Sequence, residues 1–360
     1  MGDRYRRGSG LPRFALGYSI HMARVRRVDC GGPGIRRVRH GRGFRYLNEK
    51  GEPIRDSELL ERIRGLVIPP AWQEVWICPD VRGHIQATGY DDAGRKQYLY
   101  HESWRERRDR LKFDRMLEFA AALPRLRRQI TRDLGRRGLV RDRVLACAVR
   151  LLDLGFFRIG GEQYAAENDT YGLATVRQSH LRLERGKATF DYPAKGGQRH
   201  QQLVTDPPVL ATLRALKKRN GGGRKLLVHR QGRRWVPIRS GEINDYLKEA
   251  AGGDFSAKDF RTWNATVLAA VALGANDGQP SSASGRRRAA SAAVKQVASY
   301  LSNTPAVCRN SYIDPRVFDR FDSDETIRPE LELIVERSDP SGFPDRERIE
   351  RAVLKLLDSG

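Results

Sequence analysis

The stretch over residues 75–100, VWICPDVRGHIQATGYDDAGRKQYLY, decides the fold class of the front of the chain. Its short apolar and β-branched runs are interrupted by turn-forming residues at 78–83 and 91–94. Runs of strand length separated by such turns are typical of an antiparallel meander. We therefore predict consecutive β-strands in this stretch.

Two more short strands are predicted upstream of the meander, where GRGFRYLNEKGEPI at 41–54 has a turn at 48–51. A short helix is expected over 56–65, because Asp56 is a favourable N-cap residue. Together these elements predict a small β-rich domain over 23–105. A flexible basic tail, rich in Gly and Arg, is expected at 1–22.

The second part of the chain has apolar residues at helical spacing, which predicts a domain boundary near residue 105. We expect a mainly α-helical domain over 106–320, with a buried helix in VLACAVRLLDLG that ends at Gly155. A β-rich island at 181–204 predicts a small sheet inside it, with turns at 185–186 and 194–197. Further helices are predicted over 207–219, 240–252, 258–274, 287–303 and 305–313. The expected fold class is α+β.

Two other segments have a distinctive composition. Residues 275–288 are rich in Gly, Ser and Arg, which predicts a mobile linker. Residues 321–360 form an acidic C-terminal extension. Within it, 322–350 could be a solvated helix or a partner-binding tail, and we favour the solvated helix.

The overall charge points to a polyanionic partner. The chain has 360 residues, of which 39% are hydrophobic, and its net charge is +23. The hydrophobic content is enough for a core, and the charge excess repels itself unless an anion binds. No apolar run approaches the roughly 20 residues of a membrane span, so we expect a cytoplasmic protein without a membrane partner. The four cysteines lack a CxxC and the seven histidines lack ligand spacing, so we expect neither disulfides nor a metal.

One helix start is electrostatically unusual. SAKDFRTW places Lys258 and Arg261 in the first turn of a helix capped by Ser256, where the macrodipole is already positive. A bound anion would explain this, whereas the simpler interpretation is that Asp259 neutralises the turn and Arg261 is exposed.

Arg158 follows a buried helix at an apolar junction, so it needs a carboxylate or a phosphate.

Three further polar residues each have an ordinary structural explanation. Lys195 lies at a predicted hairpin tip, where a solvated turn lysine is common. Tyr312 ends a short helix and could be a core tyrosine. Asn303 ends the preceding helix, as Asn often does. Their order along the chain, together with Arg158 and Arg261, is more informative than any one of them.

That ordered set resembles the poxvirus-like type IB DNA topoisomerases, which have bacterial members. The resemblance rests on Arg158, Lys195, the KDFRTW motif around Arg261, and YLSNTPAVCRNSYID at 300–314. It extends to RHGRGFRY and to VIPPAWQEVWICPDVRGHIQATGYDDAGRKQYLYH in the front domain, and so covers about residues 24–318. It implies a clamp around duplex DNA, with a β-rich cap over one face and a helical catalytic domain on the other.

The resemblance also implies a reaction. A type IB topoisomerase is an isomerase that relaxes supercoiled DNA by cutting one strand through a 3′-phosphotyrosyl intermediate and then religating it, without ATP, metal or cofactor. By this resemblance Tyr312 is the nucleophile, and Lys195 is the general acid. Arg158, Arg261 and Asn303 bind the scissile phosphate. We expect a monomer that acts on double-stranded DNA in the nucleoid.

The residue types fit this chemistry independently. Forked guanidinium donors suit the charge on the nonbridging oxygens, and a lysine on a turn can protonate the leaving oxygen. Many relatives carry His at the position of Asn303, and Asn can donate a hydrogen bond but cannot ionise.

The expected DNA contacts are Lys258, Gln86, Tyr90, Arg95, Lys96 and Tyr98. An alternative is that Tyr90 and Tyr98 face the core of the cap.

Two other functions use similar features. A tyrosine site-specific recombinase has the same residue types, but usually has His where this chain has Lys258, and its amino domain is typically helical. A non-enzymatic DNA-coating protein needs only the charge. That interpretation leaves Tyr312 and Lys195 without a role.

Overall fold

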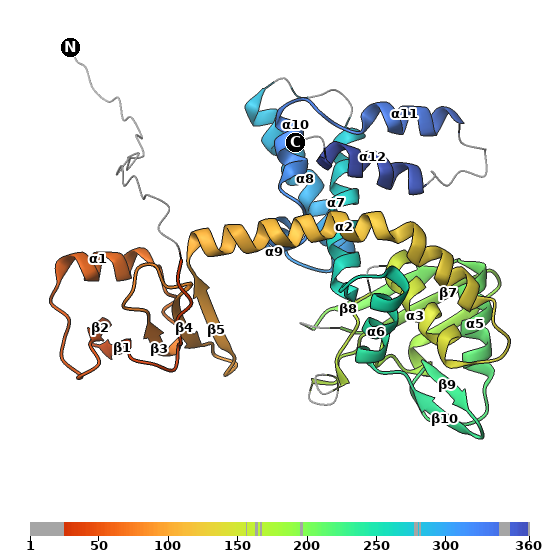
Figure 1. Ribbon diagram of the computed structural model, residues 1–360, viewed down its shortest axis with the longest axis horizontal. Helices are drawn as coiled ribbons and strands as arrows, with labels where there is room; N and C mark the ends of the chain where they lie inside the picture. The colour runs from red at the N-terminus through yellow and green to blue at the C-terminus, as the bar shows by residue number, and fades with distance from the viewer. Residues whose placement is uncertain are drawn as a thin grey trace, which may run out of the picture. The chain divides into compact units, whose positions relative to one another are not determined.

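The computed structural model describes residues 25–155, 157–162, 165, 168–194, 197–276, 280, 282–337 and 346–358 (Figure 1). The chain divides into two compact units, residues 1–111 and 112–360. The division falls within the long helix α2, Glu102–Leu134. Strand content in the first unit and helix content in the second confirm the α+β class.

Unit 1 is built on a five-stranded antiparallel sheet with the order β2-β1-β3-β4-β5. Its elements are β1 Ile35–His40, β2 Gly43–Leu47, α1 Ser57–Gly65, β3 Gln73–Ile77, β4 Ile85–Tyr90 and β5 Lys96–Tyr100. Asp56 caps α1 by accepting from the backbone N–H groups of Glu58 and Leu59. The meander strands β3, β4 and β5 and the capped helix are therefore confirmed. The prediction of two strands within 41–54 is wrong in part: only β2 lies there, it pairs with β1 upstream, and the chain after the turn at 48–51 makes only an isolated bridge between Leu47 and Pro53.

Unit 2 is mainly helical and contains two small antiparallel sheets. Its elements after α2 are α3 Arg141–Leu154, β6 Leu181–Glu184, β7 Lys187–Pro193, β8 Arg199–Val204, α5 Pro207–Lys218, β9 Val228–Gln231, β10 Arg234–Pro237, α6 Ser240–Ala251, α7 Ala257–Gly274, α8 Ala283–Leu301, α9 Pro305–Ser311, α10 Arg316–Asp322, α11 Arg328–Arg337 and α12 Arg346–Asp358. The predicted sheet at 181–204 is β6-β7-β8.

The centre of unit 2 is α3, which packs against α5, α6 and α7. Residues Val144–Val149 of α3 are all buried. A helix that is apolar on all sides belongs inside a domain, because no face of it suits water. The buried end of α3 places the loop that carries Arg158.

Two sequence predictions for unit 2 are wrong or incomplete. The stretch 275–288 is not all linker, because α8 begins at Ala283 and Ser282 caps it through the N–H of Gly285 at 3.1 Å. The hairpin β9-β10 was not predicted, although Gly232 at its turn has a φ of +59°.

The acidic extension is also different from the prediction. It forms α11 and α12, and α12 packs against α7, α10 and α11. Ile349, Val353 and Leu357 are buried at a spacing of four residues, so α12 has an apolar stripe that needs a partner surface. This stripe outweighs the acidic composition, and α12 is part of unit 2.

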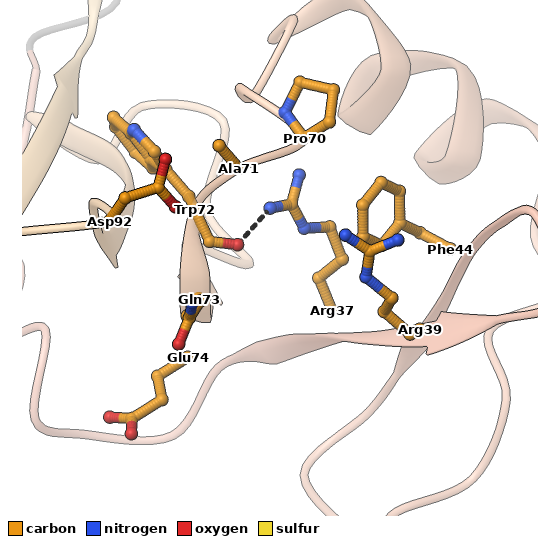
Figure 2. Close-up of a pocket in the computed structure, with 9 residues that line it drawn as sticks. All are labelled: Arg37, Arg39, Phe44, Pro70, Ala71, Trp72, Gln73, Glu74 and Asp92. Atoms are coloured by element: carbon orange, nitrogen blue, oxygen red, sulfur yellow. Dashed lines mark hydrogen bonds between the residues drawn. The ribbon is translucent and has the colours of Figure 1, made fainter.

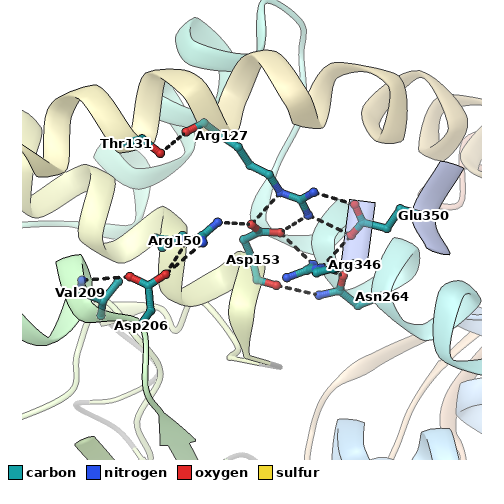
Figure 3. Close-up of polar contacts among 9 residues, drawn as sticks. All are labelled: Arg127, Thr131, Arg150, Asp153, Asp206, Val209, Asn264, Arg346 and Glu350. Carbon is teal, nitrogen blue, oxygen red and sulfur yellow. Dashed lines mark hydrogen bonds and ion pairs between the residues drawn. The ribbon is translucent and has the colours of Figure 1, made fainter. Parts of the chain in front are cut away.

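A buried ion network connects α12 to α2 and α3 (Figure 3). Arg127 donates to Asp153 at 2.9 and 3.0 Å and to Glu350 at 2.6 and 2.9 Å. Arg346 donates to Asp153 at 2.9 Å and to Asn264 Oδ1 at 3.1 Å. Burial alone would raise the pKa of Asp153, but the charges of Arg346 and Arg127 hold it below its usual value. The carboxylates therefore stay ionised and paired.

We predict that Glu350→Ala destabilises the protein by about 3 kcal/mol, because it leaves the buried Arg127 guanidinium with an incomplete set of acceptors. The exposed Glu347 of the same helix is a matched control, and Glu347→Ala is expected to change stability by less than about 0.5 kcal/mol. Urea unfolding measures both. Equal effects of the two substitutions would contradict a structural role for the network.

Candidate active site

The loop after α3 is held in place by its glycines. The carbonyl of Arg158 accepts from the N–H of Leu173 at 2.9 Å. Gly160 has a φ of +76°, and a Cβ on Gly172 would collide with its Cα atom. Only glycine permits this close backbone approach. The loop therefore fixes the backbone position from which the Arg158 side chain extends.

Two arginines converge on the carboxyl end of α8. Arg158 Nη2 donates to the carbonyl of Ser302 at 2.9 Å and to Asn303 Oδ1 at 2.6 Å. Arg261 Nη2 donates to the carbonyl of Leu301 at 2.9 Å. The last carbonyls of a helix lack intrahelical partners and carry partial negative charge, which suits guanidinium groups. The end of α8 thus holds both side chains in one place.

Arg261 is buried, with 5% of its surface exposed. Asp259 does not neutralise it: the carboxylate of Asp259 accepts from the N–H and hydroxyl of Ser256 at 2.7 and 3.0 Å. The simpler interpretation, an exposed Arg261, is therefore wrong. Burial lowers the pKa of Arg261, and its contact with Tyr312 opposes that shift. Lys258, one turn earlier, is exposed.

Tyr312 lies at the end of α9, beside Arg261. The Arg261 Cζ atom is 5.2 Å from the centroid of the Tyr312 ring. The backbone on both sides of Tyr312 is anchored, because Lys112 Nζ donates to the carbonyl of Ser311 at 3.3 Å and the N–H of Asp314 donates to Thr266 Oγ1 at 3.1 Å. Predicted site residues from three separate segments, 158, 261 and 303–312, thus come together. Lys195 lies outside the described residues.

One donor atom of the Asn303 side chain has no hydrogen-bond partner among the described residues. An arginine can only donate, so the contact with Arg158 identifies the Oδ1 atom of the amide. Asn303 Nδ2 is then the donor, and it is buried without a hydrogen-bond partner among the described residues. A buried donor in that state is costly, so the site is suited to an acceptor such as a phosphate oxygen.

His200 on β8 belongs to the same site and was missed by sequence reasoning. It is 8% exposed, and its ring centroid lies 5.2 Å from that of Phe157 and 5.0 Å from that of Tyr192. Burial and the charges of Arg261 and Arg158 lower the pKa of His200 to about 4, so the imidazole is neutral at pH 7. The only sequence signal that His200 is buried is the alternating pattern of β8, which places residue 200 on the inward face.

The predicted DNA contacts in unit 1 divide into two groups. Tyr98 is 44% exposed, and Lys96 Nζ lies 5.9 Å from its ring centroid, so these side chains share an open face of β5. The alternative that Tyr98 faces the core is wrong. Arg95 is also exposed and pairs with Asp91 at 2.7 Å. Tyr90 is half-buried.

Gln86 does not fit its predicted role as a DNA contact. It is 5% exposed, and its Nε2 donates to the carbonyls of Val81 at 3.0 Å and Gly83 at 2.7 Å. Its Oε1 accepts from Arg62 at 2.8 Å. The amide is therefore fully used inside the cap, where it holds the turn at 78–83.

A pocket of about 470 Å³ in unit 1 does not involve the predicted catalytic residues (Figure 2). Its Arg37 donates to the carbonyl of Trp72 at 2.7 Å and to that of Pro69 at 3.0 Å. The Arg37 guanidinium also lies 4.1 Å from the centroid of the Phe44 ring. Arg37 therefore stabilises the loop before β3 and is not free for a ligand.

Among the residues that the structure describes, no group of three or more His, Cys, Asp or Glu side chains is arranged to hold a metal ion. No described helix is both long and apolar enough to cross a membrane. The four cysteines are free thiols.

Comparisons with known proteins agree with the geometry. The family model for the catalytic core of eukaryotic DNA topoisomerase I matches residues 101–327, and that for the N-terminal domain of bacterial DNA topoisomerase IB matches 43–91. DNA topoisomerase 1B of Acanthamoeba polyphaga mimivirus is 28% identical over 315 residues, which are 86% of this chain and 93% of that protein. DNA topoisomerase 1 of Candidozyma auris and that of Candida albicans are each 33% identical over 129 residues, 35% of this chain and 16% of theirs. The chain belongs to the type IB DNA topoisomerase family.

Proposed function

We propose that this topoisomerase relaxes supercoiled DNA by cutting one strand of a duplex through Tyr312 and then resealing it. The observation that carries the proposal is the convergence of Arg158, Arg261 and the Asn303 amide, whose Nδ2 has no partner among the described residues, with Arg261 beside the Tyr312 ring. Two guanidinium groups and an unused donor next to a phenol suit a phosphodiester.

In the cleavage step, the Tyr312 hydroxyl loses its proton to water and its oxygen attacks the scissile phosphorus, which forms a 3′-phosphotyrosyl bond while the bond to the 5′ oxygen breaks. The negative charge gathers on the nonbridging oxygens, where Arg158 and Arg261 bind it. Their bonds to the end of α8 fix both guanidinium groups beforehand, so little reorganisation is needed when DNA binds.

The leaving 5′ oxygen needs a proton, and we assign its donation to Lys195, which lies in sequence between β7 and β8. Religation is the reverse: the 5′ hydroxyl attacks the phosphotyrosine and Tyr312 leaves. The phosphotyrosyl bond keeps the energy of the broken strand, so no ATP is consumed. The two guanidinium groups supply the positive charge that the phosphate requires.

We propose double-stranded DNA as the partner of a monomeric enzyme that acts in the cytoplasm on nucleoid DNA. Residues 23–105 are assigned to the DNA-binding cap and 106–320 to catalysis. In the cap, the open face of β5 with Lys96 and Tyr98 is the favoured contact surface. Lys258, exposed in the first turn of α7, is the favoured contact from the catalytic part.

A tyrosine recombinase is the second candidate, and it is less well supported. The β-sheet of unit 1 and Lys258 at the start of α7 both differ from the usual recombinase pattern. Relaxation of a plasmid without paired recombination sites, with EDTA and without ATP, would distinguish the two. Recombinant products without relaxation would favour the recombinase.

Tyr312→Phe is expected to abolish plasmid relaxation and covalent trapping while noncovalent duplex binding changes by less than about threefold. The substitution removes only the oxygen that attacks phosphorus, and keeps the ring beside Arg261. Gel assays of relaxation and denaturant trapping measure the loss, and a binding titration serves as control. Covalent adducts formed by the variant would refute the assignment of the nucleophile.

Lys195→Ala is expected to slow cleavage of ordinary DNA by about 10²-fold or more, as for loss of a general acid. DNA with sulfur in place of the bridging 5′ oxygen should be much less affected, because a thiolate leaves without a proton. Single-turnover cleavage of the two substrates provides the comparison. Equal slowing on both would mean that Lys195 binds or orients DNA only.

Asn303→Ala is expected to raise the cleavage barrier by about 2 to 4 kcal/mol, as for loss of one oxyanion donor. Asn303→His should recover much of this and add a titration below the usual histidine value of about 6.5 to the rate profile, because imidazole ionises, an amide does not, and the charge of Arg158 disfavours the protonated ring. Rate profiles from pH 4 to 9 test both variants. A wild-type rate for Asn303→Ala would leave the phosphate to Arg158 and Arg261.

A further inference from the structure

We propose that His200 is an additional phosphate-binding residue of the cleavage site, which donates a hydrogen bond from Nε2 to a nonbridging oxygen of the scissile phosphate. This inference rests on the proposed function, because it assigns a further contact in the same site. Neither the sequence pattern nor the comparisons assign a role to His200.

The first line of support is the position of the ring. His200 packs edge-on against Phe157, whose chain neighbour is Arg158, with 5.2 Å between ring centroids and an interplanar angle of 61°. Tyr192, on the paired strand β7, contacts His200 at 5.0 Å. The ring is therefore held between Phe157, which precedes Arg158 in sequence, and strand β7.

The second line of support is an unused polar atom. His200 is 8% exposed, and its Nε2 is buried without a hydrogen-bond partner among the described residues. A buried polar atom in this state is rare in folded proteins and calls for a partner. The nearby charged side chains, Arg158 and Arg261, offer only donors, so neither can accept from an imidazole N–H.

A phosphate oxygen is the acceptor that these surroundings favour. His200 packs against Phe157, the chain neighbour of Arg158, and the charges of Arg158 and Arg261, together with burial, lower its pKa, so both guanidinium groups are within electrostatic range of the ring. Asn303 Nδ2 is a second buried polar atom without a partner among the described residues, and the Oδ1 atom of the same amide accepts a hydrogen bond from Arg158. In the neutral tautomer of His200 that carries its proton on Nε2, one bound anion could accept from both atoms.

The decisive experiment compares two substitutions at the same position. His200→Phe keeps the ring contacts with Phe157 and Tyr192 but removes the donor, and we expect single-turnover cleavage to slow by about 10²-fold. His200→Gln keeps a donor near the same place and should stay within about tenfold of wild type. Noncovalent DNA binding and the thermal midpoint should change little in His200→Phe. His229→Phe, the same change at a buried histidine of β9, is the matched control and should cleave at the wild-type rate.

A second measurement detects the contact even if both variants are impaired. Sulfur replaces one nonbridging oxygen at a time, giving two phosphorothioate diastereomers, and sulfur is a poor acceptor. The penalty of His200→Phe should shrink for the diastereomer that lacks the contacted oxygen, and persist for the other. Equal penalties on both would show that His200 acts through packing and would overturn the inference.

Failure of this inference differs from failure of the proposed function. If wild-type protein forms no covalent complex with DNA, the proposed function fails whatever His200 does. If wild type cleaves and His200→Phe cleaves equally fast, only the role of His200 is rejected.

Discussion

The site depends on one electrostatic arrangement, the binding of two guanidinium groups to the carboxyl end of α8. Arg158 and Arg261 come from segments that are 103 positions apart in the numbering, and the carbonyls of Leu301 and Ser302 give them a common anchor. Helix carbonyls offset only part of two full charges. The remaining positive charge, in a place that excludes much water, favours an anion in the site, and the Tyr312 ring lies beside Arg261.

The same arrangement explains why the C-terminal extension belongs to unit 2. Asp153 lies one residue before the end of α3, and the loop from that end carries Arg158. Arg127 and Arg346 fix Asp153, and Glu350 completes the set of acceptors around Arg127. Residues beyond Tyr312 in sequence thus help to fix the start of the loop that carries Arg158.

Much of the fold followed from local sequence signals. Three features could be predicted because each depends on neighbours within a few positions. They are the strand runs separated by turn residues, the N-cap Asp56 of α1, and the apolar helix α3. The predictions that failed depend on partners distant in sequence. The Gln86 amide is hydrogen-bonded to Arg62 and to the turn at 78–83, so it is not available for DNA. Helix α12 is buried because it packs against α7 and α11. His200 was missed for the same reason, since its importance comes from Phe157 and the two arginines. Arg158 and Arg261 were singled out by an apolar junction, by an unusual helix start and by the resemblance of the ordered motifs to a known family.

Asn303 shows how a neutral side chain suits this site. Its Oδ1 accepts from Arg158, and its Nδ2 is left to donate, so one amide both positions a catalytic arginine and offers a hydrogen bond to phosphate. A neutral imidazole can do both, but a protonated one can only donate, and it would add a third positive charge beside Arg158. The two arginines already depress the pKa of the neighbouring His200. An amide avoids this conflict, because its two functions are the same at every pH at which the protein is folded.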